Sequence, residues 1–295
     1  MKRTWFLILL LTVACGRRKV ENIVIKGSDT EVNVVLEAAE SFMERDSSVS
    51  VTITGGGSGV GITALFNGKC DIALSSRPLS SYEEAIAMRK GVKIVPTVFA
   101  TDAVVIITHP SINIKQLSVE QVGKIYSGEI TNWNQVGGKS GTISLYGRQS
   151  NSGTYSYFRE NIVKADFSKD VKEMNGTAQI VEGVKQDPNS IGYVGLGYII
   201  DQNGRLYDGL NALALRFNDS TVAVSPLNKG DVKAGKYPLT RPLYEFTVGE
   251  PTGKIKEFID FELSAEGQRI IESNGFLPVI ETYILAIDEK AIIER

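Results

Sequence analysis

The first hundred residues alternate between short apolar runs and stretches of helical spacing. Four apolar runs have the length of buried strands and lie near 23–26, 49–53, 71–75 and 92–99. Three intervening stretches are predicted to be helices: 32–45, 59–67 and 80–90. In the first of these, Val32, Val35 and Phe42 recur at the spacing of one helix face. This alternation predicts an α/β fold with a parallel sheet and right-handed crossovers.

The second half of the chain has its own pattern of elements. A long apolar run over 103–108 would carry the chain from one lobe into another. The elements expected beyond it lie at 119–126, 143–146, 154–163, 178–186 and 191–194. From about residue 212 the chain returns to strand-like segments such as 244–248, and a helix follows over 253–263. We therefore predict a lobe I formed by 23–105 plus 215–295 and a lobe II formed by 106–214.

The two ends of the chain carry patterns of a different kind. The positively charged start and the apolar core over 5–13 are typical of an export signal, since the core is too short to span a bilayer. The following Ala14-Cys15 resembles a bacterial lipobox with Cys15 as the lipidation site, although Thr12 stands where leucine is most common. Residues 1–22 are thus predicted to be a signal peptide with lipobox and tether; an ordinary signal with an incidental cysteine is the alternative.

The last fifteen residues, 281–295, contain apolar side chains at spaced positions. This spacing predicts a surface helix that packs on lobe I. A helix that binds a partner protein is the alternative.

Composition narrows the class of protein. The chain has 295 residues, of which 42% are hydrophobic and 22% charged, and its formal net charge is −2. These values fit a globular body and give no sign of a nucleic-acid surface. A protein so close to neutrality must hold an anion with local groups rather than with a global field. His109 is the only histidine, and Cys15 and Cys70 are the only cysteines, so we expect neither a metal site nor another cofactor.

The segment 145–154, Leu-Tyr-Gly-Arg-Gln-Ser-Asn-Ser-Gly-Thr, carries the strongest signal for chemistry. It is predicted to be a strand, a loop with the guanidinium of Arg148, and a helix start at Ser152, Gly153 and Thr154. The first N–H groups of a helix lack partners and carry partial positive charge, and arginine adds a forked donor. Such groups suit a small tetrahedral oxyanion, although Ser-Gly-Thr is also an ordinary helix cap.

Three further turns place hydroxyls, glycines or an arginine after a predicted strand. They are 27–30 with Ser28, Asp29 and Thr30, 55–59 with Gly57 and Ser58, and 75–78 with Ser76 and Arg77. Ligands of open α/β sheets bind outside the carboxyl ends of the strands. We therefore expect the four donor-rich turns to converge on one ligand rather than to act as four independent helix caps.

Taken in order, these motifs resemble those of the substrate-binding lipoproteins of bacterial phosphate ABC transporters, in the type II periplasmic binding-protein class. The matching segments are 27–30, 56–59, 71–77, 125–133, 148–154 and 191–195. The resemblance covers nearly the whole mature chain. It implies two α/β lobes joined by hinge strands, with phosphate bound in the cleft between them and delivered to a membrane permease. It also implies an exported, membrane-anchored monomer that faces the periplasm or the cell exterior and binds no nucleic acid.

The resemblance also implies the residues of the site. They are Ser28, Asp29, Thr30, Gly57, Ser58, Ser76, Arg77, Arg148, Ser152, Gly153 and Thr154. Many family members carry a carboxylate where this chain has Ser76, and that carboxylate accepts the proton of phosphate and repels sulfate. Asp29 would replace this acceptor if it faces the ligand, or would only cap the following helix. Arg77 would contact the anion, hold Asp29 in place, or lie on the surface.

Other classes of function are compatible with parts of this pattern. A receptor for sulfate, molybdate or another oxyanion would use the same donors. A secreted serine hydrolase or phosphatase is a more distant alternative, because Val60 replaces the last glycine of the Gly-x-Ser-x-Gly elbow. An adhesive or sensory protein could reuse the same fold. We expect a binding protein rather than an enzyme.

Overall fold

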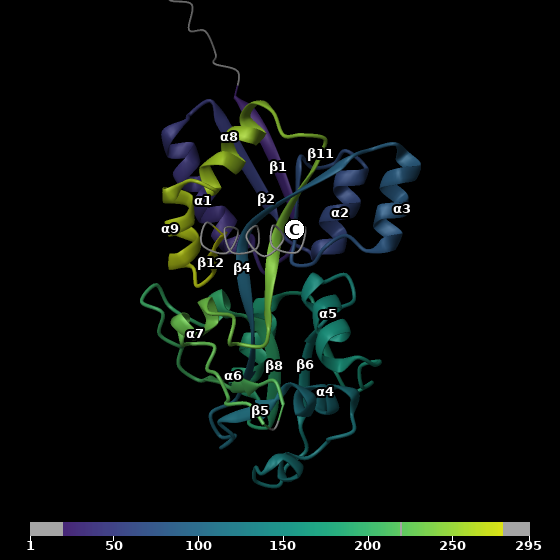
Figure 1. Ribbon diagram of the computed structural model, residues 1–295, viewed down its shortest axis with the longest axis vertical. Helices are drawn as coiled ribbons and strands as arrows, with labels where there is room; N and C mark the ends of the chain where they lie inside the picture. The colour runs from purple at the N-terminus through teal and green to yellow at the C-terminus, as the bar shows by residue number, and fades with distance from the viewer. Residues whose placement is uncertain (1–19, 219, 280–295) are drawn as a thin grey trace, which may run out of the picture.

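A computed structural model of the chain describes residues 20–218 and 220–279. Figure 1 shows two parts, one above the other, with the long strands β4 and β11 running between them. The predicted lipidation site at Cys15 and the predicted helix at 281–295 lie outside the described residues.

The upper part, which we call lobe I, is built from both ends of the described chain. Its first elements are β1 (Glu21–Gly27), α1 (Val32–Arg45), β2 (Val49–Thr54), α2 (Ser58–Phe66), β3 (Ile72–Ser75) and α3 (Ser81–Lys90). Its last elements are β11 (Thr240–Val248), α8 (Gly253–Glu262), α9 (Ala265–Ser273) and β12 (Leu277–Pro278). The three helices predicted in the first hundred residues therefore agree with the observed bounds to within one residue.

The sheet of lobe I is parallel among the first three predicted strands, whereas the fourth, at 92–99, has antiparallel neighbours. β1 pairs in parallel with β2 on one side and with β3 on the other. β11 then lies antiparallel between β3 and β4 (Ile94–Thr108). β4 is one continuous strand that spans both the predicted strand at 92–99 and the apolar run at 103–108. The α/β fold class is confirmed.

The lower part, lobe II, extends the same sheet. Its elements are β5 (Gln116–Ser118), α4 (Val119–Ser127), η1 (Trp133–Val136), β6 (Ser144–Arg148), α5 (Gly153–Phe158), η2 (Arg159–Val163), β7 (Lys172–Met174), α6 (Thr177–Gln186), β8 (Ser190–Gly195), η3 (Leu196–Tyr198), β9 (Asn211–Ala212), β10 (Ala214–Arg216) and α7 (Lys229–Lys233). The strand order across both lobes is β2-β1-β3-β11-β4-β8-β6-β7. The two lobes are therefore joined through β4 and β11.

Each lobe has its own core. One core of lobe I lies between the sheet and helices α1, α8 and α9, and a smaller one lies under α2. The core of lobe II begins at Ala103 on β4 and ends with Leu239, directly before β11. The return to lobe I thus comes after Leu239 and not at the predicted boundary of 214/215. The reason is that Leu215 and Tyr237 are buried in lobe II and β10 pairs in parallel with β5.

Candidate anion-binding site

The first three predicted turns bring buried hydroxyl groups together at the end of the lobe I sheet. Ser28 follows β1, Ser58 opens α2 and Ser76 follows β3, and none of the three is more than 2% exposed. Ser28 Oγ donates to Ser76 Oγ at 3.2 Å, and Ser58 Oγ lies 3.5 Å from Ser76 Oγ. The Ser58 hydroxyl also accepts from the backbone N–H of Ser76 at 3.2 Å. The turns at the carboxyl ends of these strands therefore form one cluster of hydroxyl groups.

Lobe II presents its own helix start to this cluster. Ser152 caps α5 by accepting from the N–H groups of Thr154 and Tyr155. Thr154 Oγ1 lies 3.1 Å from Thr30 Oγ1 of lobe I, and both side chains are buried. These contacts join hydroxyls from the two lobes.

Gly153 leaves no room for a side chain between the lobes. A Cβ atom at this position would lie 2.3 Å from Ser58 Oγ and 2.6 Å from Ser76 Oγ. Gly57, with φ of 99°, forms the corresponding close contact from lobe I, because a Cβ there would lie 2.7 Å from the carbonyl oxygen of Asn151. Glycine is therefore required at both positions for the two lobes to come this close.

Arg148 and Asp29 form an ion pair across the lobes. Arg148 Nη2 donates to Asp29 Oδ2 at 2.5 Å, and the arginine side chain is 1% exposed against 19% for the aspartate. Arg148 Nη1 also donates to Thr177 Oγ1 at 2.9 Å. The Nε–H of Arg148 is buried and has no hydrogen-bond partner among the described residues. An unpaired buried donor is costly, which favours a site that receives an anion.

Asp29 does not cap α1. The N-cap residue of that helix is Glu31, which makes no side-chain capping hydrogen bond. Asp29 Oδ1 instead accepts from the N–H of Gly56 at 3.0 Å, while its backbone carbonyl accepts from the hydroxyl of Tyr198. The prediction that Asp29 only caps the helix is wrong, because its carboxylate is turned toward Gly56 and Arg148.

Arg77 does not join the cluster. Its guanidinium forms two short bonds to Glu83, with Nη1 2.6 Å from Oε2 and Nη2 2.8 Å from Oε1. Glu83 is itself fixed by the capping box that Ser80 forms at the start of α3. The predictions that Arg77 contacts the anion or holds Asp29 are therefore not supported, because its forked donor is used by a neighbouring carboxylate.

The buried pair of Arg241 and Asp102 was missed in the sequence. Arg241 Nη2 donates to Asp102 Oδ2 at 2.9 Å, and both side chains are almost completely buried. The same nitrogen lies 3.0 Å from Thr154 Oγ1. Burial raises the pKa of Asp102, and the charge of Arg241 opposes that rise. The available signal was an aspartate inside the long apolar strand β4 and an arginine at the start of β11, since such charges are rarely buried unless they are paired.

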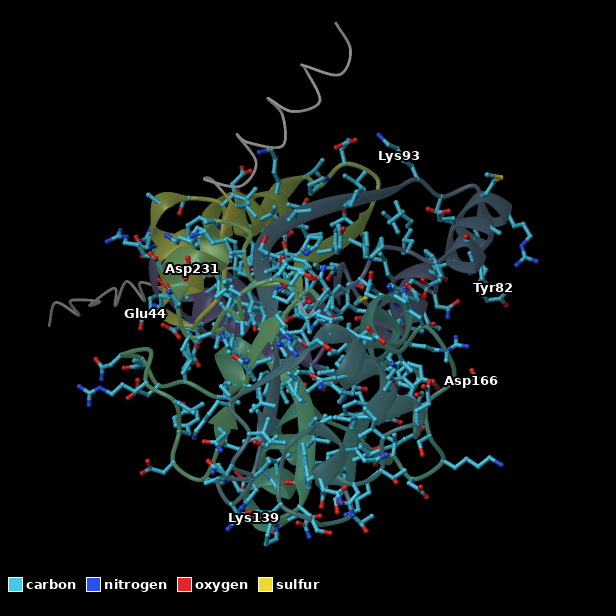
Figure 2. The ribbon with its side chains drawn as sticks, turned by 60° about the horizontal axis from the view of Figure 1, so that its bottom comes forward. Glu44, Tyr82, Lys93, Lys139, Asp166 and Asp231 are labelled. Atoms are coloured by element: carbon cyan, nitrogen blue, oxygen red, sulfur yellow. The ribbon has the colours of Figure 1, made fainter. Side chains whose placement is uncertain are left out.

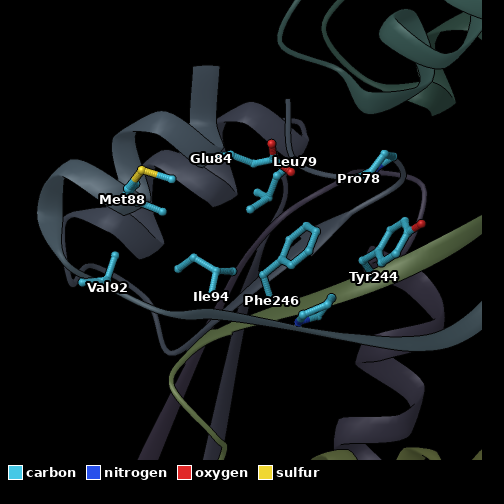
Figure 3. Close-up of a pocket in the computed structure, with 10 residues that line it drawn as sticks. Pro78, Leu79, Glu84, Met88, Val92, Ile94, Tyr244 and Phe246 are labelled. Carbon is cyan, nitrogen blue, oxygen red and sulfur yellow. The ribbon is translucent and has the colours of Figure 1, made fainter. Parts of the chain in front are cut away.

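Exposed charged side chains lie away from the hydroxyl cluster. Figure 2 shows Lys93, Lys139 and Asp166 at the outside of the molecule. A separate groove of about 420 Å³ lies between α3, β4 and β11 and is lined mainly by apolar side chains such as Met88, Ile94 and Phe246 (Figure 3). The polar side chains of this lining are those of Glu84 and Tyr244, and no arginine, lysine or serine side chain of the described residues lines the groove, so the hydroxyl cluster is the candidate site.

Within 20–218 and 220–279, no group of histidine, cysteine, aspartate and glutamate side chains is arranged to hold a metal ion. Within the same ranges, no helix has both the length and the apolar character needed to cross a membrane.

Comparison with known proteins identifies relatives along nearly the whole chain. Residues 12–266 match the family model described as a PBP superfamily domain. The phosphate-binding protein PstS of Borreliella burgdorferi is 34% identical over 293 residues, covering 95% of this chain and 99% of that protein. The phosphate-binding protein PstS of Pseudomonas aeruginosa strain PAO1 is 30% identical and covers 92% of this chain and 86% of its own.

A solved structure is also similar in fold. It is the crystal structure of a putative phosphate ABC transporter substrate-binding protein from Clostridium perfringens with bound phosphate. It has a TM-score of 0.76 and 29% sequence identity, and the match covers 88% of this chain and 100% of that one.

Proposed function

The chain belongs to the family of phosphate-binding proteins PstS within the PBP superfamily, and on that premise we propose that it binds inorganic phosphate and delivers it to an ABC transporter permease. The observation that carries the proposal is the convergence of buried donors from both lobes. The proposed phosphate-binding residues are Ser28, Asp29, Thr30, Gly57, Ser58, Ser76, Arg148, Ser152, Gly153 and Thr154. Arg77 is left out because Glu83 occupies its guanidinium.

The charges at the site support binding through dipoles rather than through net charge. Arg148 is paired with Asp29, and Arg241 is paired with Asp102. Each arginine charge is thus balanced by a carboxylate of the chain itself. Hydroxyls, backbone N–H groups at helix starts and the unpaired Nε–H of Arg148 would then hold the anion.

Asp29 supports a preference for phosphate over sulfate. Each of its carboxylate oxygens takes one hydrogen bond, from Gly56 and from Arg148. A carboxylate offers about four acceptor positions, so capacity remains for the proton that phosphate carries and sulfate lacks. This residue would do the work of the carboxylate that many relatives carry at the position of Ser76.

The affinity expected from such a site is adequate for a receptor. Charge-assisted hydrogen bonds contribute roughly 1.5–3 kcal/mol each, so several of them supply more than ten kcal/mol before costs. Association and lobe closure remove part of this sum. A remainder of about 8 kcal/mol corresponds to roughly micromolar binding.

We further propose that the protein acts as a monomer outside the cytoplasm and is held at the membrane by a lipid on Cys15. The support is the charged start, the short apolar core and the Ala14-Cys15 motif of the first 22 residues. Cys15→Ala should release the protein from the membrane fraction, and mass spectrometry of the amino-terminal peptide should detect the lipid in the unchanged protein.

Titration calorimetry on the processed, lipid-free protein tests the binding proposal. Phosphate should bind with submillimolar or higher affinity between about pH 6 and 8.5, and sulfate should not bind. Comparable binding of sulfate would indicate a general oxyanion receptor. Ser58→Ala should weaken phosphate binding, whereas Ser273→Ala, an exposed hydroxyl at the end of α9, should leave it unchanged.

A further inference from the structure

Arg241 lies where β11 passes between the lobes. Its neighbour Thr240 pairs with Ala103 of β4, at the start of the lobe II core. The side chain is 3% exposed, and its Nε and Nη2 both donate to Asp102 Oδ2, at 3.2 and 2.9 Å. Arg241 Nη1 donates to the backbone carbonyl of Ser76 at 3.3 Å. The guanidinium is therefore fixed to both long strands and to the end of β3.

The same guanidinium contacts one hydroxyl from each lobe. Its Nη2 lies 3.0 Å from Oγ1 of Thr154 in lobe II and 3.4 Å from Oγ1 of Thr30 in lobe I. The two threonine oxygens lie 3.1 Å from each other. A guanidinium has donors and no acceptor, so both hydroxyls must act as acceptors toward Arg241. No other direction of these two hydrogen bonds is chemically available.

This contact determines where the hydroxyl protons go. A hydroxyl has one proton to donate, and accepting from Arg241 leaves that proton free to point away from the guanidinium. Between the two threonines, one O–H can be used in the mutual contact, so at least one remains for a ligand. An anion that enters between them accepts from both.

We propose that Arg241 is a positioning residue of the phosphate site, which turns Thr30 and Thr154 into donors toward the anion when the lobes meet. This proposal rests on the proposed function. Arg241 acts through the two hydroxyls, and its own charge is balanced by Asp102.

The surroundings of Arg241 explain why a lysine would not position the hydroxyls of Thr30 and Thr154 in the same way. The plane of the guanidinium is held by Asp102, and the ring of Tyr157 lies beneath it, with 5.4 Å between the guanidinium carbon and the ring centroid. The Tyr157 hydroxyl is in turn bound to the carbonyl of Thr240 at 3.1 Å. Lysine offers a point charge on a flexible stem and lacks the Nε and Nη1 donors that hold the guanidinium against Asp102 and the carbonyl of Ser76.

A double-mutant cycle for phosphate affinity tests the proposal. The four proteins are the unchanged chain, Arg241→Lys, Thr154→Val and the combination of the two. Titration calorimetry with inorganic phosphate gives the affinities, and thermal unfolding of each protein without phosphate reports on stability. Arg159→Lys is the matched control, because Arg159 forms an ion pair with Asp166 on the surface of lobe II.

We expect Arg241→Lys to weaken phosphate binding by about tenfold or more in the unchanged chain and by a clearly smaller factor when Thr154 is already valine. Arg159→Lys should leave affinity unchanged. An equal loss of phosphate affinity with threonine and with valine at position 154 would show that Arg241 does not act through the Thr154 hydroxyl. Full phosphate affinity in Arg241→Lys would overturn the proposal altogether. If the unchanged chain bound no phosphate, the proposed function would fail as well.

A second variant keeps the test decisive if Arg241→Lys does not fold. Asp102→Asn combined with Arg241→Gln removes both charges and leaves no unpaired ion in the core. This double variant should bind phosphate more weakly, and the loss of affinity should be larger when Thr154 is present than when it is replaced by valine. Retained affinity in this double variant would overturn the proposal.

Discussion

At the scale of single residues, the site depends on how two arginines are paired. Arg148 is bound to Asp29 across the lobes, and Arg241 is bound to Asp102 between the long strands. Pairing fixes the guanidinium groups in place and reduces the attraction that each would exert on any anion. Discrimination between anions therefore falls to the acceptor side of these pairs, above all to Asp29.

Asp29→Asn should weaken phosphate binding and reduce the preference over sulfate. The change removes the charge that pairs with Arg148 and the acceptor proposed for the phosphate proton. Loss of one charge-assisted hydrogen bond costs roughly 1.5–3 kcal/mol, which corresponds to a factor of about 10 to 150 in affinity. Calorimetric titrations of both anions measure the two effects separately.

The control for this change is Asp166→Asn, which removes the aspartate of an arginine–aspartate pair at the surface. The affinities of this control for both anions should be those of the unchanged protein. An unaltered ratio of phosphate to sulfate affinity in Asp29→Asn would show that another group selects the anion.

The sequence allowed most of the candidate site to be located, and its errors have a common cause. Ser28, Ser58 and Thr154 could be found because each follows a strand and precedes a helix. Arg77 fits the same rule, but Glu83 lies six residues later and takes its guanidinium. Arg241 lies within a strand, where a local pattern gives no sign of Asp102 far away in the chain. Partner choice between distant side chains is decided by tertiary structure.

At the scale of elements, β11 contributes to a buried pair of acidic residues in addition to the ion pair of Arg241 with Asp102. Glu245 of β11 and Glu262 of α8 are 0% and 1% exposed, and their carboxylate oxygens have no partner that satisfies hydrogen-bond geometry among the described residues. Burial raises the pKa of Glu245 to about 7. Burial and the nearby charge of Glu245 raise the pKa of Glu262 well above its usual range. Both carboxyl groups thus favour the protonated form in the folded protein.

The free energy of unfolding should therefore fall as the pH rises from about 4.5 to about 7. The unfolded chain releases the Glu245 proton near the ordinary pKa of 4.5, whereas the folded chain keeps it until about pH 7. The stability that the Glu245 proton contributes is complete below pH 4.5 and is lost as the pH approaches 7. Glu245→Gln should lessen the fall in melting temperature between pH 4.5 and 7.5, measured by thermal unfolding.

Glu250→Gln serves as the control for this pH dependence, because Glu250 is an exposed residue that pairs with Lys93 at the surface. Its melting temperature should follow the unchanged protein at every pH. The interpretation of Glu245 fails if Glu245→Gln has the same pH profile as the unchanged protein.

The elements themselves were largely predictable, because most are short and strictly periodic. α1 was located to the residue by its apolar face. β4 was expected as two segments, since Thr101 and Asp102 interrupt the apolar run. The backbone continues as one strand because β11 pairs with it up to Ala103 and β8 pairs with it from Val104 onward. The insertion of β11 between β3 and β4 could not be predicted, because pairing between strands so distant in sequence leaves no local pattern.

At the scale of the whole molecule, the two lobes meet through small and polar groups. Thr30 contacts Thr154, Asp29 contacts Arg148, and the side chain of Asn151 donates to the carbonyl of Gly56 at 3.1 Å. Gly153 leaves no room for a side chain between itself and Ser58 of lobe I. The closed arrangement therefore depends on the absence of side-chain volume at Gly153, as it does at Gly57.

Gly153→Ala should hold the lobes apart. The added methyl group would lie 2.3 Å from Ser58 Oγ, and the short serine side chain has little room to move away. We expect phosphate affinity to fall by about tenfold or more, equivalent to ~1.4 kcal/mol. Small-angle scattering should give a larger radius of gyration for this variant than for the unchanged protein at saturating phosphate.

Gly176→Ala is the matched control, since Gly176 also lies in lobe II and a Cβ atom there would meet nothing within 4 Å. Its affinity and radius of gyration should equal those of the unchanged protein. Normal affinity together with a normal radius of gyration in Gly153→Ala would contradict the role given to this glycine.

The position of β11 in the sheet has a consequence for the order in which the protein is made. β3 has β11 as its neighbour on one side, and the chain between them contains all of lobe II. At about 5–20 residues per second of synthesis, the edge of β3 waits on the order of ten seconds for its partner. Lobe II is one continuous stretch and can complete its core during that time. A nascent chain is therefore expected to pass through a stage in which lobe II is folded and β3 of lobe I still has an unpaired edge. At this stage the chain is most exposed to proteases and to aggregation.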